Sequence, residues 1–320
     1  EEVTLMDVDP MRRTGLITAV AVAAGRMSPE IRIEIEIEDV KKIQAPTIEE
    51  ALLQNKLILL AEDNLTNQEV IKRQLNRLGY ACEIADDGKK AFEMWNNKTY
   101  RLLLSDCHMP EWDGFELTAA IRNQEKGTDQ HAPIIAITAN ALQGEDQHCL
   151  NAGMDDYMTK PVAIKKLNEM LHKWMGAGSV AVDKLLTETI NTRKIKNQKT
   201  AKKKKKDNGK IKAIDDSVIK EIFGDDENEF KEVLDSFVEP SEVIIAELKK
   251  GYQSQSFDEV KEAAHKLKSS ARSVGANGLA DTCAALETAG KENDLKTMEL
   301  LVPTLDPTFD DIKNYIASLS

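Results

Sequence analysis

Hydrophobic and polar residues follow two different periods in two parts of the chain. Between residues 56 and 175, short apolar runs alternate with segments of helical period, and segment 67–79 places Val70, Leu75 and Leu78 near one face. The strand candidates are LILLA (57–61), ACEIA (81–85), LLLS (102–105), IIAIT (134–138) and YMT (157–159). Strands that alternate with helices predict a doubly wound α/β fold, a five-stranded parallel sheet with helices on both faces.

The C-terminal part of the chain has the period of helices alone. From residue 215 onward the apolar residues recur at three- and four-residue spacings, which predicts an all-α, antiparallel four-helix bundle. Pro240 stands inside the first of these helices, so we expect it to kink or split that helix. The predicted core residues are Phe230, Val233, Leu234, Phe237, Ile244, Ile245, Leu248, Phe257, Val260, Ala264, Leu267, Ala271, Val274, Leu279, Cys283, Leu286, Ile312, Ile316 and Leu319.

These patterns divide the chain into four parts. They are an N-terminal segment (1–55), the α/β domain (56–178), a linker (179–212) and the helical domain (213–320). The linker contains the lysine-rich stretch 191–212, which has almost nothing to bury and is typical of solvated chain. A contact to nucleic acid or to anionic lipid is the alternative interpretation of this stretch.

Composition narrows the class of protein. The chain has 320 residues and a net charge of −12, which argues against a protein that coats nucleic acid with its whole surface. Its four cysteines are far apart, so the sequence indicates reduced thiols rather than a zinc site. The longest apolar run, 15–25, is about half the length that a membrane span needs. Because the chain does not begin with methionine, we expect it to be part of a longer protein.

Side chains suited to phosphate chemistry follow the ends of the predicted strands. Glu62 and Asp63 follow the first strand, Asp106 the third, Thr138 ends the fourth and Lys160 follows the fifth. In a parallel sheet these carboxyl ends are neighbours. Clustered carboxylates need a cation, and oxygen ligands suit Mg²⁺. A carboxylate can also accept a phosphoryl group as an acyl phosphate, whose other oxygens the hydroxyl and the ammonium would hold.

A second candidate site lies on one helix of the bundle, in AAHKLKSSARSVGA (263–276). His265, Lys268, Ser269 and Arg272 form a single stripe at spacings of three, four and seven residues. We expect an exposed imidazole there to accept a phosphoryl group, with Lys268 to pair with it and the small Ser269 to leave room for a partner. An ordinary surface histidine on a basic helix is the alternative.

The motifs LLAEDN, LLLSDCHMPEWDGFE, IIAITANA and GMDDYMTKP resemble the response-regulator receiver domain over about 56–175. The resemblance implies that Asp106 is the phosphoacceptor. The implied Mg²⁺ ligands are Asp63, Asp106, the backbone carbonyl of Cys107 and, through water, Glu62. The other implied site residues are Thr138, Lys160 and the switch aromatic Tyr157.

AAHKLKSSA resembles the histidine phosphotransfer (HPt) domain over roughly 213–320, which implies that His265 is its phosphoacceptor. The order of the two domains resembles the C-terminal part of tripartite hybrid sensor histidine kinases. DPMRRTGLITAVAVAAGRMSPE near the N-terminus resembles the tail of a preceding degenerate receiver, with Asp9 where the lysine would stand. A docked or loose extension is the alternative for this segment.

The sequence thus predicts a phosphorelay fragment. Asp106 would take a phosphoryl group from a phosphohistidine on an upstream histidine kinase module and pass it to His265, which would donate it to a separate response regulator receiver. We expect a cytoplasmic location, no nucleic-acid partner, a membrane only through the missing part of the parent chain, and no use of ATP, because no Gly-rich nucleotide-binding segment is found. The alternatives are a docking module without transfer, or an Asp-nucleophile phosphohydrolase, which wants an acid where His108 stands.

Overall fold

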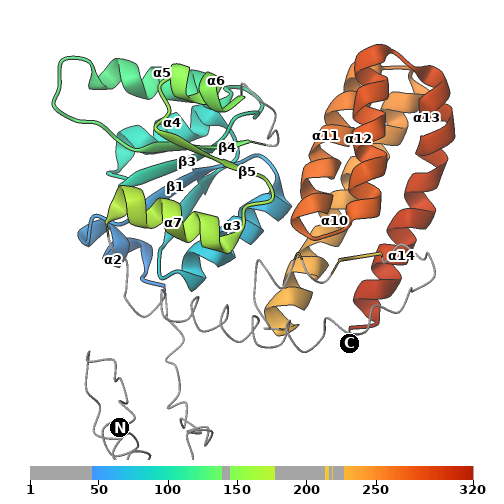
Figure 1. Ribbon diagram of the computed structural model, residues 1–320, viewed down its shortest axis with the longest axis horizontal. Coiled ribbons are helices and arrows are strands. Elements are labelled where there is room, and N and C mark those ends of the chain that lie inside the picture. The colour runs from blue at the N-terminus through green and yellow to red at the C-terminus, as the bar shows by residue number, and fades with distance from the viewer. Residues whose placement is uncertain (1–44, 139–144, 177–212, 216–217, 219–226, 320) are drawn as a thin grey trace, which may run out of the picture. The chain divides into compact units, whose positions relative to one another are not determined.

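The computed structural model describes residues 45–138, 145–176, 213–215, 218 and 227–319. These described residues group into one compact unit. Within it, a domain built on a sheet is followed by a bundle of helices (Figure 1). The N-terminal segment 1–44 and the lysine-rich stretch 191–212 lie outside the described residues, so the interpretations of both stay predictions.

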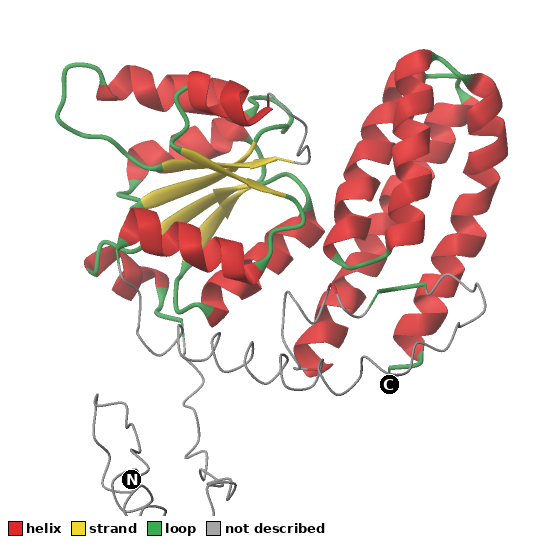
Figure 2. Ribbon diagram, in the orientation of Figure 1, coloured by secondary structure: helices red, strands yellow, loops and turns green. Residues whose placement is uncertain are grey.

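The first domain is built on one parallel sheet with the strand order β2-β1-β3-β4-β5. Figure 2 shows these strands as a single layer between helices. The strands are β1 (Ile58–Ala61), β2 (Cys82–Ala85), β3 (Leu102–Asp106), β4 (Ile134–Thr138) and β5 (Asp156–Thr159). The predicted fold class is confirmed, and each predicted strand differs from the observed one by only a residue at either end.

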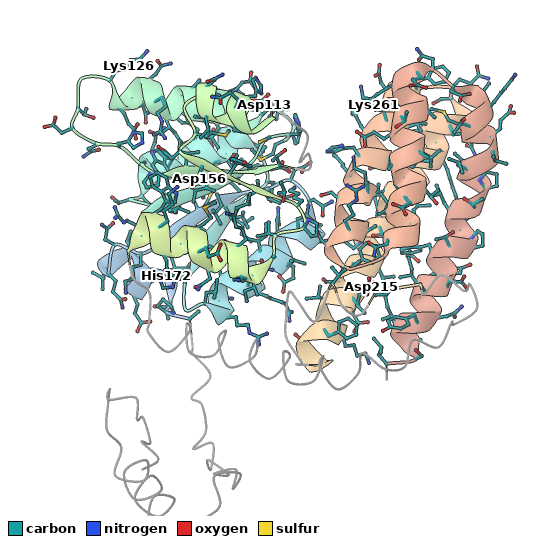
Figure 3. All side chains as sticks on the ribbon, in the orientation of Figure 1. Asp113, Lys126, Asp156, His172, Asp215 and Lys261 are labelled. Carbon is teal, nitrogen blue, oxygen red and sulfur yellow. The ribbon has the colours of Figure 1, made fainter. Side chains whose placement is uncertain are left out.

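Alternate residues of the strands feed two apolar layers, because successive side chains of a strand point to opposite faces. The helices of this domain are α2 (Ile48–Leu53), α3 (Leu65–Arg77), α4 (Gly88–Asn97), α5 (Gly114–Glu125), α6 (Glu145–Asn151) and α7 (Ile164–Met175). Ile58 and Leu60 pack toward α3 and α7, whereas Leu57 and Leu59 pack toward the helices of the other face. Figure 3 shows side chains between the sheet and the helices on both of its sides.

Helix α2 belongs with the sheet, although the sequence places it in the N-terminal segment. It begins with a capping box in which Thr47 and Glu50 hydrogen-bond each other's backbone N–H groups. Ala51 is fully buried in the same apolar layer as Leu57 and Leu59. The packed domain therefore includes residues on the N-terminal side of residue 56.

A glycine allows α5 to start directly against the end of β3. The N–H of Gly114 donates to the carbonyl of Cys107 at 3.2 Å, and a Cβ at Gly114 would lie 2.2 Å from the carbonyl oxygen of Asp106. Such a contact with backbone cannot be relieved by rotating a side chain. Glycine at this position therefore fixes how closely α5 approaches the strand end that carries Asp106.

The second domain is a bundle of long helices around a single apolar core. Its elements are α10 (Glu227–Gln253), α11 (Phe257–Ser273), α12 (Asn277–Glu292), α13 (Leu295–Leu301), the 3₁₀ turn η1 (Val302–Thr304) and α14 (Leu305–Ala317). Ile214 is fully buried in this core, so residues just before α10 also belong to the bundle. Among the described residues, no helix is long and apolar enough to cross a membrane.

Two expectations for the bundle differ from the structure. Helix α10 continues through Pro240 as one helix, so of the two expected outcomes the split is wrong, while the kink stays a prediction. A proline removes one helical hydrogen bond, but Phe237 and Ile244 on either side are both buried in the core and hold both halves of the helix in the bundle. Leu319, expected in the core, is 37% exposed because it follows the end of α14.

Candidate functional site

Three carboxylates meet at the carboxyl end of the sheet, where the sequence predicts them. Glu62 and Asp63 follow β1 and Asp106 ends β3, the neighbouring strand. Their ligand oxygens lie within 4.8 Å of one another. Glu62 is fully buried and Asp106 is 6% exposed. Oxygen donors at this spacing could hold a metal ion.

Lys160 provides the positive charge inside this cluster. Its ammonium lies 2.6 Å from Oδ2 of Asp106, 2.9 Å from Oε1 of Glu62 and 2.7 Å from Oε2 of Glu62. Only Oε1 of Glu62 accepts a hydrogen bond of suitable geometry from it, and the buried Oε2 has no hydrogen-bond partner. Oε2 is therefore held by the charge of the Lys160 ammonium and not by a hydrogen bond, so the electrostatic needs of Glu62 are only partly met.

The electrostatics of the cluster show a shortage of positive charge. Burial raises the pKa of Glu62 to about 7, and the charge of Asp106 raises it too while Lys160 opposes the rise. Burial and Asp106 likewise raise the pKa of Asp63 above its usual value. Burial would lower the pKa of Lys160, but its attraction to Glu62 and Asp106 raises it. A further cation would therefore stabilise these carboxylates.

The other predicted site residues of this domain are Thr138, Cys107 and Tyr157, and they differ in whether they line the cavity beside the cluster. Thr138, at the end of β4, is 1% exposed and lines the same cavity as Asp106. Cys107 is fully buried, with its carbonyl accepting from Gly114 and its Sγ 3.7 Å from Sγ of Cys149. Tyr157 is half-buried, packs against the apolar layer on the α4 and α5 face, and is not among the residues that line the cavity.

The histidine of the bundle is held by a residue that the sequence analysis missed. Nδ1 of His265 lies 3.1 Å from Oε1 of Glu287 on α12, and Lys268 donates to Oε2 of the same carboxylate. Lys291 also donates to it, at 3.0 Å. Burial alone would raise the pKa of Glu287, but the hydrogen bonds from His265, Lys268 and Lys291 hold it well below its usual range.

An ionised carboxylate only accepts hydrogen bonds, so the ring nitrogen facing Glu287 carries the proton. Nδ1 of His265 is therefore the N–H, and in the neutral form of the ring the lone pair lies on Nε2. Lys268 was expected to pair with a phosphoryl group on the histidine. In the structure it is paired with Glu287, and its side chain is 13% exposed. One buried acid thus orients the imidazole and anchors the neighbouring lysine.

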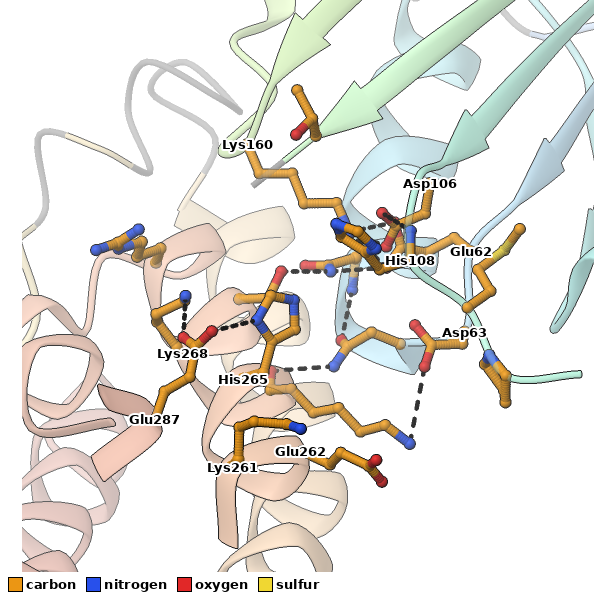
Figure 4. A pocket seen from close by; sticks show the side chains of 18 of the residues that line it. Glu62, Asp63, Asp106, His108, Lys160, Lys261, Glu262, His265, Lys268 and Glu287 are labelled. Carbon is orange, nitrogen blue, oxygen red and sulfur yellow. Dashed lines mark hydrogen bonds and ion pairs between the residues drawn. The ribbon is translucent and has the colours of Figure 1, made fainter. Parts of the chain in front are cut away.

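A single cavity of about 890 Å³ joins the two candidate sites. Asp106 and Lys160 line one side of it, and His265 and Lys268 line the other (Figure 4). The ring of His108 also lines it, with its centroid 6.2 Å from that of His265 and the two rings edge to face. The stripe of His265, Lys268, Ser269 and Arg272 borders this cavity.

Helix α3 and helix α11 are connected by buried side-chain hydrogen bonds. Nδ2 of Asn64 donates to Ser270 at 2.7 Å, and Nδ2 of Asn67 donates to Ser269 at 3.0 Å. Ser273 donates to Oδ1 of Asn67 at 2.8 Å. All five residues are at most 7% exposed. Ser269, expected to leave room for a partner, is covered by the N-terminal turns of α3.

Helix α3 also contacts the bundle through one apolar side chain and one ion pair. Val70 of α3 belongs to the buried core cluster of the bundle rather than to the sheet side where Leu75 and Leu78 lie. Arg73 forms an ion pair with Glu232 at 2.8 Å. Val70 was expected to share a face with Leu75, and the structure corrects this because α3 is buried on two sides by two different cores.

Comparisons with known proteins follow the same division of the chain. Residues 58–172 match the family model of the response regulator receiver domain, and residues 232–319 match the Hpt domain. The chain is 41% identical over 120 residues to hybrid signal transduction histidine kinase I of Dictyostelium discoideum, covering 36% of this chain and 7% of that protein. It is 36% identical over 141 residues to the sensor histidine kinase RcsC of Escherichia coli K12, covering 43% and 14%.

Among solved structures, the chain resembles the receiver domain of a Pseudomonas aeruginosa sensor histidine kinase, crystallised with a magnesium ion in its active-site cleft. The identity is 44%, the match covers 38% of this chain and 98% of that one, and the TM-score is 0.35. The chain thus spans only a small fraction of the length of the curated kinases that it matches. It contains a response regulator receiver domain followed by an Hpt domain, the two modules of a phosphorelay.

Proposed function

We propose that Asp106 and His265 are consecutive phosphoacceptors of a phosphorelay and exchange a phosphoryl group with each other. The observation that carries the proposal is the shared cavity, which has the strand-end carboxylate on one side and the imidazole on the other. Transfer within one chain needs no diffusional encounter, because the acceptor is held at high effective concentration.

The first step would load the receiver. An oxygen of Asp106 attacks the phosphorus of a phosphohistidine on an upstream kinase module, so that an O–P bond forms and the N–P bond breaks. The imidazole leaves as a neutral ring. Lys160 already lies 2.6 Å from Oδ2 of Asp106 and would pair with the new phosphoryl oxygens, and Thr138 lines the same cavity.

The second step would move the group to the bundle. Nε2 of His265 attacks the acyl phosphate, the N–P bond forms, the O–P bond breaks and Asp106 regains its charge. Glu287 accepts from Nδ1 and so keeps the lone pair on Nε2, while it balances the positive charge that the ring gains on attack. A separate response regulator would then take the group from His265 by the reverse chemistry.

We further propose Mg²⁺ as the cation of the acidic cluster, held by Asp63, Asp106 and the carbonyl of Cys107, with Glu62 behind them. The hard oxygen donors of Glu62, Asp63 and Asp106, which lie within 4.8 Å of one another, suit this ion. When bound, Mg²⁺ would neutralise charge on the transferring phosphoryl group. A cytoplasmic location and a parent kinase chain belong to the same proposal.

The test uses the whole chain with radiolabelled acetyl phosphate and Mg²⁺. Acyl phosphate is labile in base, whereas phosphohistidine is stable in base and labile in acid. We expect both kinds of label on the unaltered chain, none on Asp106→Asn and only the base-labile kind on His265→Gln. His172→Gln, on α7 of the receiver, is the matched control and should behave like the unaltered chain. Label that survives EDTA or Asp106→Asn would contradict the proposal, and label confined to Asp106 would favour a docking module without transfer.

A further inference from the structure

Helix α11 of the Hpt domain reaches two of the three carboxylates of the acidic cluster. Nζ of Lys266 lies 3.8 Å from Oδ2 of Asp63. Nδ2 of Asn67 donates both to Oε1 of Glu62, at 2.8 Å, and to Ser269 of α11. The first connection is the ion pair between Lys266 and Asp63, and the second is the amide of Asn67, which Glu62 and Ser269 share. Both connections link α11 to the candidate metal site.

We infer that Lys266 acts as a competing cation for the metal site of the receiver, so that binding of a divalent cation and docking of the Hpt domain oppose each other. The inference rests on the proposed function only in taking this cluster as the Mg²⁺ site. It assigns to the Hpt domain a residue that sets the affinity of the receiver for its metal.

The charges of the site explain why metal binding and docking should oppose each other. Three carboxylates face one buried ammonium, that of Lys160, so the cluster attracts a further positive charge. Lys266 supplies part of that charge from α11. A divalent ion among the same oxygens would satisfy Asp63 and repel the Lys266 ammonium, because like charges a few ångströms apart destabilise each other.

The shared amide strengthens the connection. Both N–H groups of Asn67 are used, one by Glu62 and one by Ser269, and its oxygen accepts from Ser273. Asn67 is 2% exposed in the docked arrangement, so losing one of its partners while α11 is docked is costly. A turn of Glu62 toward a metal ion therefore disturbs an amide that also holds α11.

Linkage between two binding events is reciprocal. If docking lowers Mg²⁺ affinity by some factor, Mg²⁺ lowers docking by the same factor. Phosphorylation of Asp106 would return negative charge to a metal-loaded site and favour docking again. The metal-loaded, unphosphorylated receiver would then be the state that best releases His265 to a separate receiver.

The first test measures Mg²⁺ binding to the whole chain by calorimetry, at low ionic strength and without any phosphoryl donor. Because Lys266 is 45% exposed, we expect Lys266→Gln to lower the Mg²⁺ dissociation constant by about two- to fivefold. The matched control is Lys261→Gln, on the same helix and cavity, whose ammonium pairs instead with Asp258 at 2.9 Å. The control should leave the dissociation constant within error.

The second test measures docking by energy transfer between dyes on Glu93→Cys of α4 and Asn314→Cys of α14, both exposed positions. The four native cysteines are buried and should not label. Mg²⁺ should lower the docked fraction of the unaltered chain and of Lys261→Gln, and should have a smaller effect on Lys266→Gln.

Three results would overturn the inference: an unchanged Mg²⁺ dissociation constant in Lys266→Gln, an equal change in Lys261→Gln, or a docked fraction that does not fall with Mg²⁺. The proposed function is tested by a separate measurement, the radiolabelled phosphoryl group on Asp106 and on His265. Intact transfer with an unchanged dissociation constant would therefore remove only the inference about Lys266.

Discussion

The acidic site of the receiver and the histidine of the Hpt domain are built in opposite ways. Glu62, Asp106 and Lys160 come from separate strand ends, and the parallel sheet brings them together whatever lies outside the domain. His265 sits on one helix, and its surroundings come from Glu287 on the next helix and from the docked receiver.

The difference has a physical consequence. The acidic site is buried and pre-assembled, with an ammonium already in contact with its carboxylates. The imidazole is about one-third exposed and depends on two neighbours for its tautomer and its covering. Variants of the first site should therefore have their largest effect on the stability of the receiver, whereas variants around the second should destabilise the bundle less and should also alter the orientation of the imidazole and docking.

The largest expected effect is that of Lys160→Met. Removing one partner of a buried charge cluster leaves Glu62 and Asp106 without compensation, so the receiver should lose about 3 kcal/mol of unfolding free energy in EDTA. The three tryptophans, Trp95, Trp112 and Trp174, all lie in the receiver, so their fluorescence during urea unfolding reports on this domain alone.

The control is Lys173→Met, whose lysine pairs with Asp156 at a surface and is 59% exposed. It should change the stability by less than about 1 kcal/mol. Mg²⁺ should restore part of the loss in Lys160→Met, since a cation can replace the missing charge. Equal losses in the two variants would mean that the acidic site is not pre-assembled.

Glu287→Gln should have an intermediate effect, on the bundle. Gln cannot balance Lys268 and Lys291, so the bundle should lose about 2 kcal/mol at pH 7. The folded-state pKa of Glu287 lies below its ordinary value of 4.5. Its contribution is therefore present above pH 4.5 and is lost as the pH falls through the lower folded-state value. Far-UV circular dichroism during urea unfolding at a series of pH values measures it.

The difference between the unaltered chain and Glu287→Gln should shrink as the pH falls below 4.5. A difference that stays constant down to the lowest pH at which the chain folds would show that Glu287 contributes by packing and not by charge. Nitrogen chemical shifts of the imidazole provide a second readout, because the proton should lie on Nδ1 of His265 in the unaltered chain.

The contrast between the two sites also explains what the sequence could and could not predict. Strand ends are fixed by apolar runs, so Glu62, Asp63, Asp106, Thr138 and Lys160 could be placed together from spacing alone. Glu287 was missed, yet it follows Leu286 in AALETAG, and an acid beside a core position is a signal that a buried partner exists.

The contact between the receiver and α11 could not be predicted from the sequence, for a different reason. Periodicity shows which face of a helix is buried but not what buries it, so Val70 was placed on one face with Leu75 and Leu78 although it packs into the bundle. Ser269 was expected to leave room for a partner, but the sequence could not identify Asn67 as the residue that contacts it. The same limit applies to Pro240, where local propensity predicted a kink or a split and the helix continues without a split.

The smallest expected effect concerns the hydrogen bond between Asn64 and Ser270. Asn64→Ala and Ser270→Ala should each lower the docked fraction in the energy-transfer measurement, and the double variant should lose less than the sum. The coupling free energy should be about 1 kcal/mol. Thr282→Ala, which removes a hydroxyl bonded within α12, should be additive with Asn64→Ala. Additivity of the Asn64 and Ser270 changes would contradict this contact.

The most direct test of the account is a single-turnover time course of transfer from Asp106 to His265. The whole chain is loaded with radiolabelled acetyl phosphate, the donor is removed, and samples are quenched in acid or in base. The account predicts that base-labile label falls as base-stable label rises at the same rate, and that His265→Gln shows no base-stable label. Loss of the label only to inorganic phosphate, or base-stable label in His265→Gln, would contradict it.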